Sequence, residues 1–339
     1  MQIEQIGLSE LEQRAEELKL TLPIEQTHQW ASYQATIEGR SPWRCVRFAD
    51  DDRTLALASL MDFETHGYHF LRSEHGPVWV EGPSEALEAQ AITALCDYVR
   101  SEHRAAAFIR MAVKHALDVT RPTLSTIPYD RTVILDVTGG DEAILSRMKP
   151  RGRRDVRKAL RESPIECADE TERASASFEE YYPLMVETGE RDGFTPAPMS
   201  DYENMMHILG TGHCRLYAGR LDGRLTNWSM VTVSGKRATR YYAASSTDTM
   251  RMHVGDKLVY FEACELGRLF DGTVSEYDLM AIGSDLSPEL NGLNEFKCKF
   301  SKEVAEVAPD RDVPLRKTLY AALADRSEER RVGKECRSR

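Results

Sequence analysis

The sequence predicts an α/β protein built from two copies of one architecture, each a β-sheet with helices on both sides. Two sets of short segments rich in β-branched and aromatic residues alternate with amphipathic segments, one set in the first third of the chain and one beginning at Thr132. The chain has 339 residues, and 41% of them are hydrophobic, so it can fill two cores of ordinary size. We expect the boundary between the two domains near Asp130.

The first set of elements follows from alternating apolar residues. The segments expected to form strands are 43–48, 54–61, 69–71 and 106–111. Residues 84–102 have the apolar period of an amphipathic helix. This order places a helix between the third and fourth strands of the first domain.

The second set begins with the apolar run 132–137, which Asp-rich and Gly-Gly turns bound. Helices are expected over 177–190, 201–209 and 255–270, and further strands over 214–220, 225–234, 237–244 and 275–280. The turn Leu221-Asp222-Gly223-Arg224 separates two of these strands and is typical of a β-hairpin.

One helical segment, 141–162, carries a concentration of positive charge. Ile144, Met148, Val156 and Leu160 can share its apolar face, although Pro150 and Gly152 must interrupt it. The basic residues follow helical spacing: Arg153, Arg157 and Arg161 at i, i+4 and i+8, with Arg154 and Lys158 beside them and Lys149 just before. Such a face is either simply solvated or binds a polyanion.

Composition excludes several classes of protein. The formal net charge is −11, so general affinity for nucleic acid is not expected, and any RNA contact must use a local basic patch. The seven cysteines include no C-x-x-C pair and no histidine at ligand spacing, so we predict neither a metal site nor a disulfide framework. No apolar run reaches 18 residues, and the acidic stretch 4–20 is unlike a signal peptide, so we expect a cytoplasmic protein.

Five motifs occur in a characteristic order. Residues 276–283 read EYDLMAIG and residues 293–300 read LNEFKCKF; the others are HGPV at 75–78, MKPRGRRDVRKA at 148–159 and YYAASS at 241–246. Together they resemble the FemX-like (FemABX) aminoacyltransferases, which build peptidoglycan cross-bridges from aminoacyl-tRNA. The interval from Met199 to His213 is too short for the coiled-coil insertion of longer members, so the resemblance is to the compact type.

The resemblance implies an α/β fold of two tandem GNAT-like (acyl-CoA N-acyltransferase-like) domains. It also implies that a C-terminal helix, expected over 313–324, returns to the first domain. The expected domains are 1–130 plus 309–325 and 131–308. Residues 326–339 resemble a vector-derived tail, and without them the formal net charge falls from −11 to −14.

The implied reaction is attack by an amine on the ester carbonyl of an aminoacyl-tRNA. The ester is already activated, so the enzyme needs no nucleophile, metal or cofactor, but it must align the reactants and stabilise the oxyanion. The resemblance implies that Lys297 stabilises the oxyanion and that Phe296 packs beside it. It also implies that the basic segment binds the tRNA phosphates. The residues expected to contact tRNA are Lys149, Arg153, Arg154, Arg157, Lys158 and Arg161.

The acceptor implied is the stem peptide of a peptidoglycan precursor, either UDP-MurNAc-pentapeptide or lipid II, and a lipid-linked acceptor would bring peripheral contact with a membrane. The expected acceptor-binding residues are Tyr242, Ser245, Asp278, Trp30, Tyr33, Tyr202 and Arg110. Gln34 and Ala197 stand where family members grip the acceptor's diphosphate with Lys and Arg, so either Arg40, Arg44 or Arg110 substitutes or the acceptor is the lipid-linked form. Ala112 replaces a carboxylate, which leaves no identifiable general base.

Three other functions remain open. The same chemistry can act on a small-molecule scaffold, and an acyl-CoA-dependent N-acetyltransferase would share the fold. The latter class needs [QR]-x-x-G-x-[GA] before a helix, whereas residues 220–225 lack the final small residue and fall in the expected hairpin. A non-enzymatic RNA-binding role fits poorly with the acidic composition.

Overall fold

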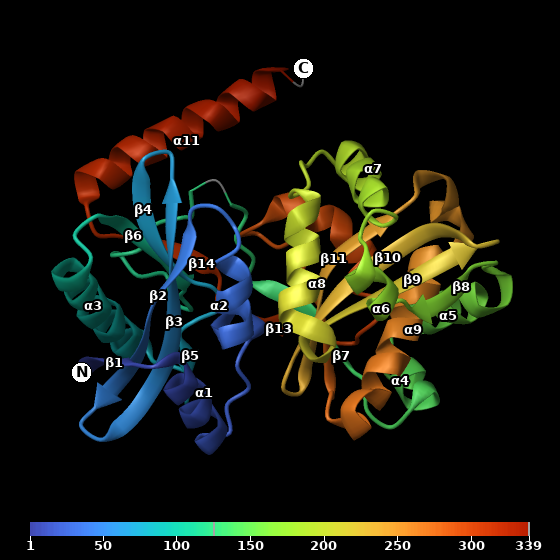
Figure 1. Ribbon diagram of the computed structural model, residues 1–339, viewed down its shortest axis with the longest axis horizontal. Coiled ribbons are helices and arrows are strands. Elements are labelled where there is room, and N and C mark those ends of the chain that lie inside the picture. Colours follow the sequence, from blue (N-terminus) through green and yellow to red (C-terminus); the bar gives the residue numbers. More distant parts are fainter. Residues whose placement is uncertain (125, 338–339) are drawn as a thin grey trace. The chain divides into compact units, whose positions relative to one another are not determined.

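The computed structural model describes residues 1–337 except Ser125, with side chains described up to residue 327. The chain forms two compact units (Figure 1). The first unit comprises Met1–Asp130 together with Val307–Arg339, and the second comprises Arg131–Glu306. Each unit has its own β-sheet and its own hydrophobic cores.

The sheet of the first unit contains strands from both ends of the chain. Its strands are β1 (Gln2–Ile6), β2 (Arg40–Asp50), β3 (Arg53–Thr65), β4 (Tyr68–Ser73), β5 (Val78–Trp79), β6 (Ala106–Ala112) and β14 (Asp310–Pro314). Their order is β1-β2-β3-β4-β6-β14, with β5 paired to β3. Only β4 and β6 are parallel, and the helix α3 (Glu85–Glu102) lies between them in the sequence.

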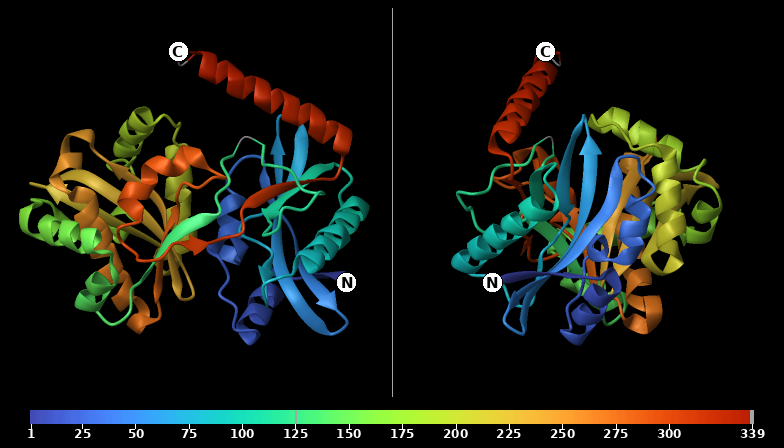
Figure 2. Two further views of the ribbon diagram at one scale, coloured as in Figure 1. Left: turned by 180° about the vertical axis from the view of Figure 1, so that it is seen from behind. Right: turned by 60° about the vertical axis from the view of Figure 1, so that its left-hand side comes forward.

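Alternation along the strands gives the first sheet two apolar faces. Ala56, Ala58 and Leu60 of β3 pack with α3, whereas Leu57 packs with α1 (Leu8–Glu17). In Figure 2, α3 lies on one side of this sheet, and α1 and α2 (His28–Gln34) lie on the other. The helix α11 (Lys317–Arg337) is attached to the same unit by Tyr320, whose ring contacts that of Phe108 at 5.4 Å.

The second unit repeats this topology. Its strands are β7 (Arg131–Asp136), β8 (Glu166–Asp169), β9 (Cys214–Leu221), β10 (Arg224–Ser234), β11 (Arg237–Ser245), β12 (Glu276–Ala281) and β13 (Ala305–Glu306), in the order β13-β7-β12-β11-β10-β9-β8. The parallel pair is β11 and β12, and α9 (Val254–Arg268) connects them. In both units an antiparallel run of three strands is therefore followed by a helix and a parallel strand.

Helices cover both faces of the second sheet. On one face lie α4 (Asp141–Arg147), α5 (Pro150–Glu162) and α9, whose apolar residues join one core with the strands. On the other face lie α6 (Thr171–Ala176), α7 (Tyr182–Asp192) and α8 (Met199–His213). Here the ring of Phe178 stacks on Tyr202 at 5.4 Å and meets Trp228 edge-on at 5.3 Å. Two sheets of this kind, each covered by helices, confirm the predicted α/β class.

Each strand expected from the sequence is present, but three expectations need correction. Residues 313–314 end strand β14, and the C-terminal helix begins at Lys317 rather than Val313. That helix does not end at Ala324 but continues to Arg337, through most of the segment expected to be a tail, 326–339; the last two residues of that segment lie outside the described residues. Leu160, expected on the apolar face of its helix, is 47% exposed, and Ala159 is buried instead.

None of the helices among the described residues is both long enough and apolar enough to span a bilayer.

Candidate active site

The end of strand β12 and the short helix α10 (Asn294–Lys297) are held together by a reciprocal amide contact. The Asn294 side chain accepts a hydrogen bond from the Gly283 N–H at 2.7 Å and donates to the Gly283 carbonyl at 3.1 Å. A Cβ atom at Gly283 would lie 2.4 Å from the backbone nitrogen of Asn291. Only glycine allows this close approach, so two of the sequence motifs meet here for a steric reason.

Lys297 is the last residue of α10 and points back to the strand end. Its Nζ donates a hydrogen bond to the carbonyl oxygen of Ala281 at 2.9 Å. Partial burial lowers the pKa of Lys297 from its ordinary 10.5 to about 8, with a smaller contribution from the positive charge of Arg240. Near neutral pH this ammonium is therefore charged but close to its titration point.

Asp278 is a buried carboxylate, 8% exposed, on β12. It accepts hydrogen bonds from the Thr132 hydroxyl and from the backbone N–H of Met280, the latter at 2.8 Å. Its negative charge opposes the fall in the pKa of Lys297. The sequence-predicted pair Asp278 and Lys297 thus interacts electrostatically within one unit.

A buried polar network lies behind this pair, and the sequence analysis did not foresee it. Glu262 of α9 has no exposed surface, and it accepts hydrogen bonds from Ser229 and Tyr277 and forms an ion pair with Arg240 at 3.2 Å. Burial and the neighbouring Glu262 carboxylate raise the pKa of Tyr277. The EYD motif contains one member of this network, Tyr277, but the partners of that tyrosine are distant from it in the sequence.

Phe296 and Lys299 form a second part of the site. The Phe296 ring packs on Phe300 at 5.3 Å and touches the position where a Cβ at Gly255 would lie. The Nζ of Lys299 lies 5.0 Å from the centre of the Phe296 ring and 2.5 Å from Asp256. Phe296 thus packs beside Lys299, a buried cation that the sequence analysis did not single out.

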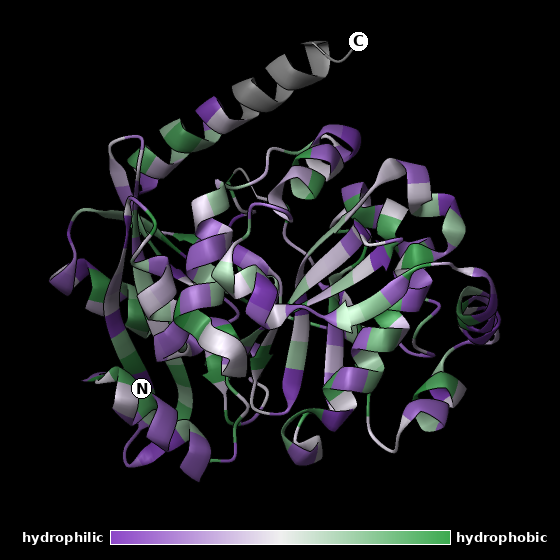
Figure 3. Cartoon of the chain, turned by 45° about the vertical axis from the view of Figure 1, so that its right-hand side comes forward, coloured by the Kyte–Doolittle hydropathy of each residue, from purple (hydrophilic) through white to green (hydrophobic). Residues whose placement is uncertain are grey.

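The predicted basic helix divides at Pro150 into α4 and α5, and most of its basic side chains reach solvent. Arg154, Arg157, Lys158 and Arg161 of α5 are exposed, while Lys149 and Arg153 are partly buried. The Arg153 guanidinium donates a hydrogen bond to the carbonyl of Met148 at 2.6 Å, so it binds the backbone at the C-terminal end of α4. Figure 3 shows α5 as hydrophilic over most of its length.

The first turn of α5 is attached to α10 and the residues after it. Arg151 pairs with Glu295 at 2.5 Å, and the Lys149 N–H donates to the carbonyl of Lys299 at 3.2 Å. Lys299 also pairs with Asp155 of α5 at 3.5 Å. Gly152 permits this contact, because a Cβ there would lie 2.1 Å from the Lys299 carbonyl oxygen. The basic helix and the Lys297 motif are therefore neighbours.

Two of the predicted acceptor residues of the second unit, Tyr202 and Tyr242, lie together on the sheet face opposite α9. The Tyr242 ring meets that of Tyr202 at 5.0 Å. Tyr202 is 2% exposed, and burial raises its pKa to about 12, so it is a core residue. Ser245 is held by its backbone, whose N–H donates to the Thr188 hydroxyl at 3.1 Å. The side chains of Tyr242 and Ser245 are partly exposed.

The remaining predicted acceptor residues lie in the first unit. Trp30 and Tyr33 are each 3% exposed and pack edge-to-face at 5.2 Å. Arg110, 4% exposed, binds both carboxylate oxygens of Asp312 at 2.7 and 2.9 Å. Its guanidinium is therefore engaged within the protein rather than presented to a diphosphate.

The other proposed substitutes for a diphosphate grip are also engaged. Arg40 donates to the side-chain oxygen of Gln34 at 2.7 Å, and Arg44 pairs with Glu102 at 2.8 Å. Ala197 contributes its carbonyl to the Tyr182 hydroxyl at 3.1 Å. Ala112 ends β6 and pairs with Asp310 of β14.

Comparison with known proteins identifies the fold. Residues 146–297 match the family model described as Acetyltransferase (GNAT) domain. The crystal structure of FemX is similar at a TM-score of 0.70 and 17% identity, over 95% of this chain and 99% of that one. A search of curated proteins finds no match to the sequence.

Two further structures are similar at lower scores. One is the C-terminal domain (DUF2156) of an Agrobacterium fabrum protein assigned as a lysylphosphatidylglycerol synthetase, with a TM-score of 0.53, 14% identity, and coverage of 93% of this chain and 96% of that one. The other is a tandem GNAT protein from the clavulanic acid biosynthesis pathway, with a TM-score of 0.51, 12% identity, and coverage of 93% and 98%. The chain thus has the FemX-like acyltransferase fold of two tandem GNAT-like domains.

Proposed function

We propose that this protein is a tRNA-dependent aminoacyltransferase that adds an amino acid to the stem peptide of a peptidoglycan precursor in cross-bridge formation, and that it acts in the cytoplasm. The observation that carries the proposal is the attachment of the exposed basic helix α5 to the Lys297 motif. Arg151–Glu295 and Asp155–Lys299 join the two directly. A polyanionic donor held along α5 would have its reactive end beside an ammonium group.

The proposed reaction uses Lys297 in its charged ammonium form. The lone pair of the acceptor amine attacks the ester carbonyl of the aminoacyl-tRNA, and negative charge develops on the carbonyl oxygen. The bond from carbon to the ribose oxygen then breaks, and that oxygen leaves with a proton that the amine gives up. An ammonium positioned by the Ala281 carbonyl stabilises the oxyanion, which is worth about 3 kcal/mol for one such donor.

Asp278 and the Glu262 network hold Lys297 in its charged form and in place. Asp278 favours the ammonium electrostatically, whereas Arg240 opposes it. Because Glu262 neutralises Arg240 through an ion pair at 3.2 Å, it limits this opposition. In this proposal Glu262 is a positioning residue, since it acts through Arg240 and contacts no substrate.

The acceptor is proposed to bind beside Tyr242 and Ser245. Both side chains are partly exposed on the sheet that carries Asp278. The similarity to the FemX structure supports a peptidoglycan precursor as the acceptor. The similarity to a lysylphosphatidylglycerol synthetase domain shows that the fold also occurs in a protein named for an aminoacylated lipid, which is compatible with lipid II as the acceptor.

Acyl-CoA-dependent acetyl transfer is the competing function, and the similarity to a tandem GNAT structure is compatible with it. Two observations disfavour it. Arg220, the first residue of the nearest CoA-type motif, is bound to Glu170 at 2.6 Å and to Glu180 at 2.6 Å, and the motif turns between β9 and β10 instead of beginning a helix. A pyrophosphate there would find an occupied guanidinium and no helix N-terminus.

The test is to incubate the protein with mixed charged tRNA and either UDP-MurNAc-pentapeptide or lipid II, and to measure product masses. We expect the mass of one or more aminoacyl groups on one acceptor. Prior ribonuclease treatment should abolish the product, and acetyl-CoA should support none. Undiminished product after complete digestion of tRNA would refute the proposed donor.

A further inference from the structure

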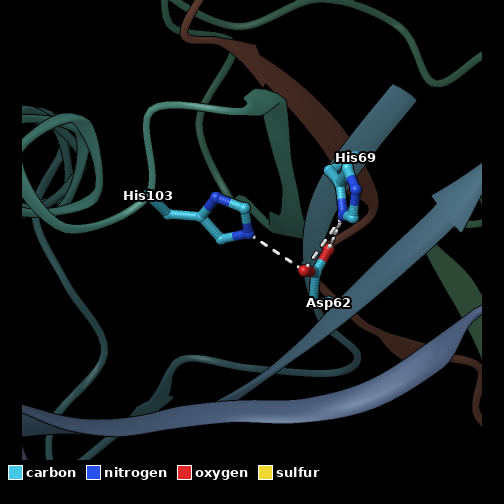
Figure 4. A group of neighbouring side chains, drawn as sticks. All are labelled: Asp62, His69 and His103. Carbon is cyan, nitrogen blue, oxygen red and sulfur yellow. Dashed lines mark hydrogen bonds and ion pairs between the residues drawn. The ribbon is translucent and has the colours of Figure 1, made fainter. Parts of the chain in front are cut away.

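Asp62, His69 and His103 bring three potential metal ligands together in the first unit. They lie on β3, on β4 and at the residue that follows α3, respectively (Figure 4). Their ligand atoms all lie within 4.8 Å of one another. Among the described residues this is the one group of three or more His, Cys, Asp and Glu side chains that meets this distance.

The sheet and the helix explain why the three side chains converge. Ala56, Ala58 and Leu60 of β3 face α3, and two residues further along the same strand Asp62 emerges on the same face. Leu71 of β4 is directly opposite Asp62 and belongs to the same core, so His69, two residues before it, also faces α3. Helix α3 ends over this position, and His103 follows its last residue.

The distances from Asp62 to the two histidines are close to those between ligands of one metal ion. Asp62 Oδ2 lies 2.9 Å from His103 Nε2, and His69 Nδ1 lies 3.1 Å from each carboxylate oxygen. Ligand atoms on a tetrahedral zinc ion, each at about 2.0–2.2 Å, are roughly 3.3 Å apart. Small side-chain rotations are therefore enough for an ion to replace the hydrogen bonds.

The charge of the group also favours a bound metal ion. The Asp62 side chain is only 16% exposed, yet no Lys or Arg lies within 4 Å of its carboxylate in the part of the chain with described side chains. The buried carboxylate of Asp312 contrasts with it, because Asp312 is neutralised by Arg110 at 2.7 Å. A part-buried carboxylate faced by two imidazoles needs a proton or a metal ion to balance its charge.

The surroundings also orient the imidazoles. The ring of Trp43 lies 5.8 Å from the ring of His103, and the two histidine rings are 5.8 Å apart. His103 is 15% exposed and His69 is 34% exposed, so the site is shielded on one side and open on the other. Three nitrogen and oxygen ligands with an open fourth position suit zinc, with water as the remaining ligand.

We propose that Asp62, His69 and His103 bind one Zn²⁺ ion, which fastens the end of α3 to the β3–β4 hairpin. The cysteine pattern gave no hint of this site because none of its ligands is a cysteine and the two histidines are 34 residues apart in the sequence. The site belongs to the first unit, whereas Lys297 belongs to the second. Its test is therefore independent of the proposed transferase activity.

The experiment is calorimetric titration of ZnCl₂ into tag-free protein stripped with a chelator, with zinc content measured after dialysis. We expect one equivalent of bound zinc. Asp62→Asn, His69→Ala and His103→Ala should each weaken zinc binding at least about tenfold, because loss of even an outer-shell partner costs 10–100-fold. His28→Ala, which removes an exposed histidine paired with Glu12 at 2.9 Å, is the matched control and should bind as the parent does.

Two further measurements do not depend on how well the variants fold. X-ray absorption at the zinc edge of the loaded parent should show nitrogen and oxygen ligands including two imidazoles, and no sulfur. Zinc should also raise the melting temperature of the parent, since a ligand that binds only the folded state stabilises it. Sulfur ligands, which would point to the six free cysteines of the described side chains, or unchanged binding in the three variants, would overturn the proposal.

Discussion

Lys297 is the residue on which the proposed chemistry depends most directly. Replacing it by methionine keeps its length and removes its charge. We expect turnover to fall by roughly two to three orders of magnitude, the usual loss for one oxyanion donor, while acceptor binding stays nearly intact. Steady-state kinetics with charged tRNA would measure both effects. A variant within about threefold of the parent rate would exclude Lys297 from that role.

The pKa of Lys297 predicts a pH dependence with a definite sign. The pKa is lowered to about 8, so the proposed catalytic cation is fully charged well below that pH and loses its charge as the pH rises through it. The rate should therefore fall above pH 8. In Lys297→Arg this fall should disappear, because arginine stays protonated throughout the range. An unchanged descending limb in the arginine variant would assign the limb to another group.

The same shift affects stability in the opposite sense. The unfolded chain keeps the Lys297 proton up to its ordinary pKa of 10.5, whereas the folded protein releases it near 8. The unfolded state binds more protons between these values, so this lysine makes the free energy of unfolding rise with pH there. Activity and stability should thus diverge above pH 8.

At the scale of single elements, helix α5 is proposed to contact tRNA phosphates through its exposed arginines. Replacing Arg157 and Arg161 by alanine should raise the Michaelis constant for charged tRNA and reduce its log–log salt slope by up to about two, since each duplex phosphate contact contributes nearly one. The acceptor's Michaelis constant should barely change. The matched control is Arg53→Ala with Arg100→Ala, which removes two exposed arginines from the first unit.

If the control pair lowers the salt slope as much as the α5 pair, net charge and not the helix attracts the tRNA. If the α5 pair weakens the acceptor and leaves the slope unchanged, the helix instead serves an acceptor's diphosphate.

The contact between α5 and the segment after α10 depends on Gly152. An added Cβ would lie 2.1 Å from the Lys299 carbonyl oxygen, so Gly152→Ala must push the two segments apart. We expect a loss of roughly 1–3 kcal/mol in unfolding free energy, the range for overpacking, measured by urea denaturation. Gly212→Ala is the control, because no atom lies within 4 Å of the added Cβ. Equal stabilities for the two variants would contradict the tight contact.

The elements differ in how far the sequence could predict them. The longer strands of the two sheets have strong alternation, and the hairpin at Leu221–Arg224 has a specific turn sequence, so both were predictable. Leu160 was misplaced because the buried face of α5 runs through Gly152, Val156 and Ala159, which leaves Leu160 outside it. Strands β1, β5, β8, β13 and β14 were missed because each is short, at most five residues, and β14 also carries three charged residues, Asp310, Arg311 and Asp312.

The site was predictable where it lies within a motif and not where it depends on distant partners. Asp278 and Lys297 stand in two motifs that the Gly283–Asn294 contact joins. Glu262 lies on α9 without a motif, and its contacts with Ser229 and Tyr277 span 33 and 15 residues. Pairings of this kind are set by packing of the whole unit, which a single sequence does not reveal.

At the scale of the whole molecule, the two units differ in how they are encoded. The second unit is one continuous stretch, Arg131–Glu306, with a complete sheet and core. We expect this stretch alone to fold, with a cooperative thermal transition by circular dichroism. Residues 1–130 alone should not fold, because they lack β14 and leave Arg110 buried without Asp312, and breaking such a pair costs about 3–5 kcal/mol.

Adding residues 307–339 as a separate peptide should restore structure to 1–130 if β14 and Asp312 are what it lacks. A cooperative transition in 1–130 by itself would show that the first unit does not need the C-terminal segment.

The position of β14 in the chain has a consequence for biosynthesis. A ribosome releases the N-terminal part of a protein first, and domains usually fold in that order. Here β14, which pairs with the edge of β6 that β4 does not occupy, is translated only after all of residues 131–306. The second unit can therefore finish folding while the sheet of the first unit still lacks β14 and has an unpaired edge at β6. Nascent chains of this protein should need protection at that edge until translation ends.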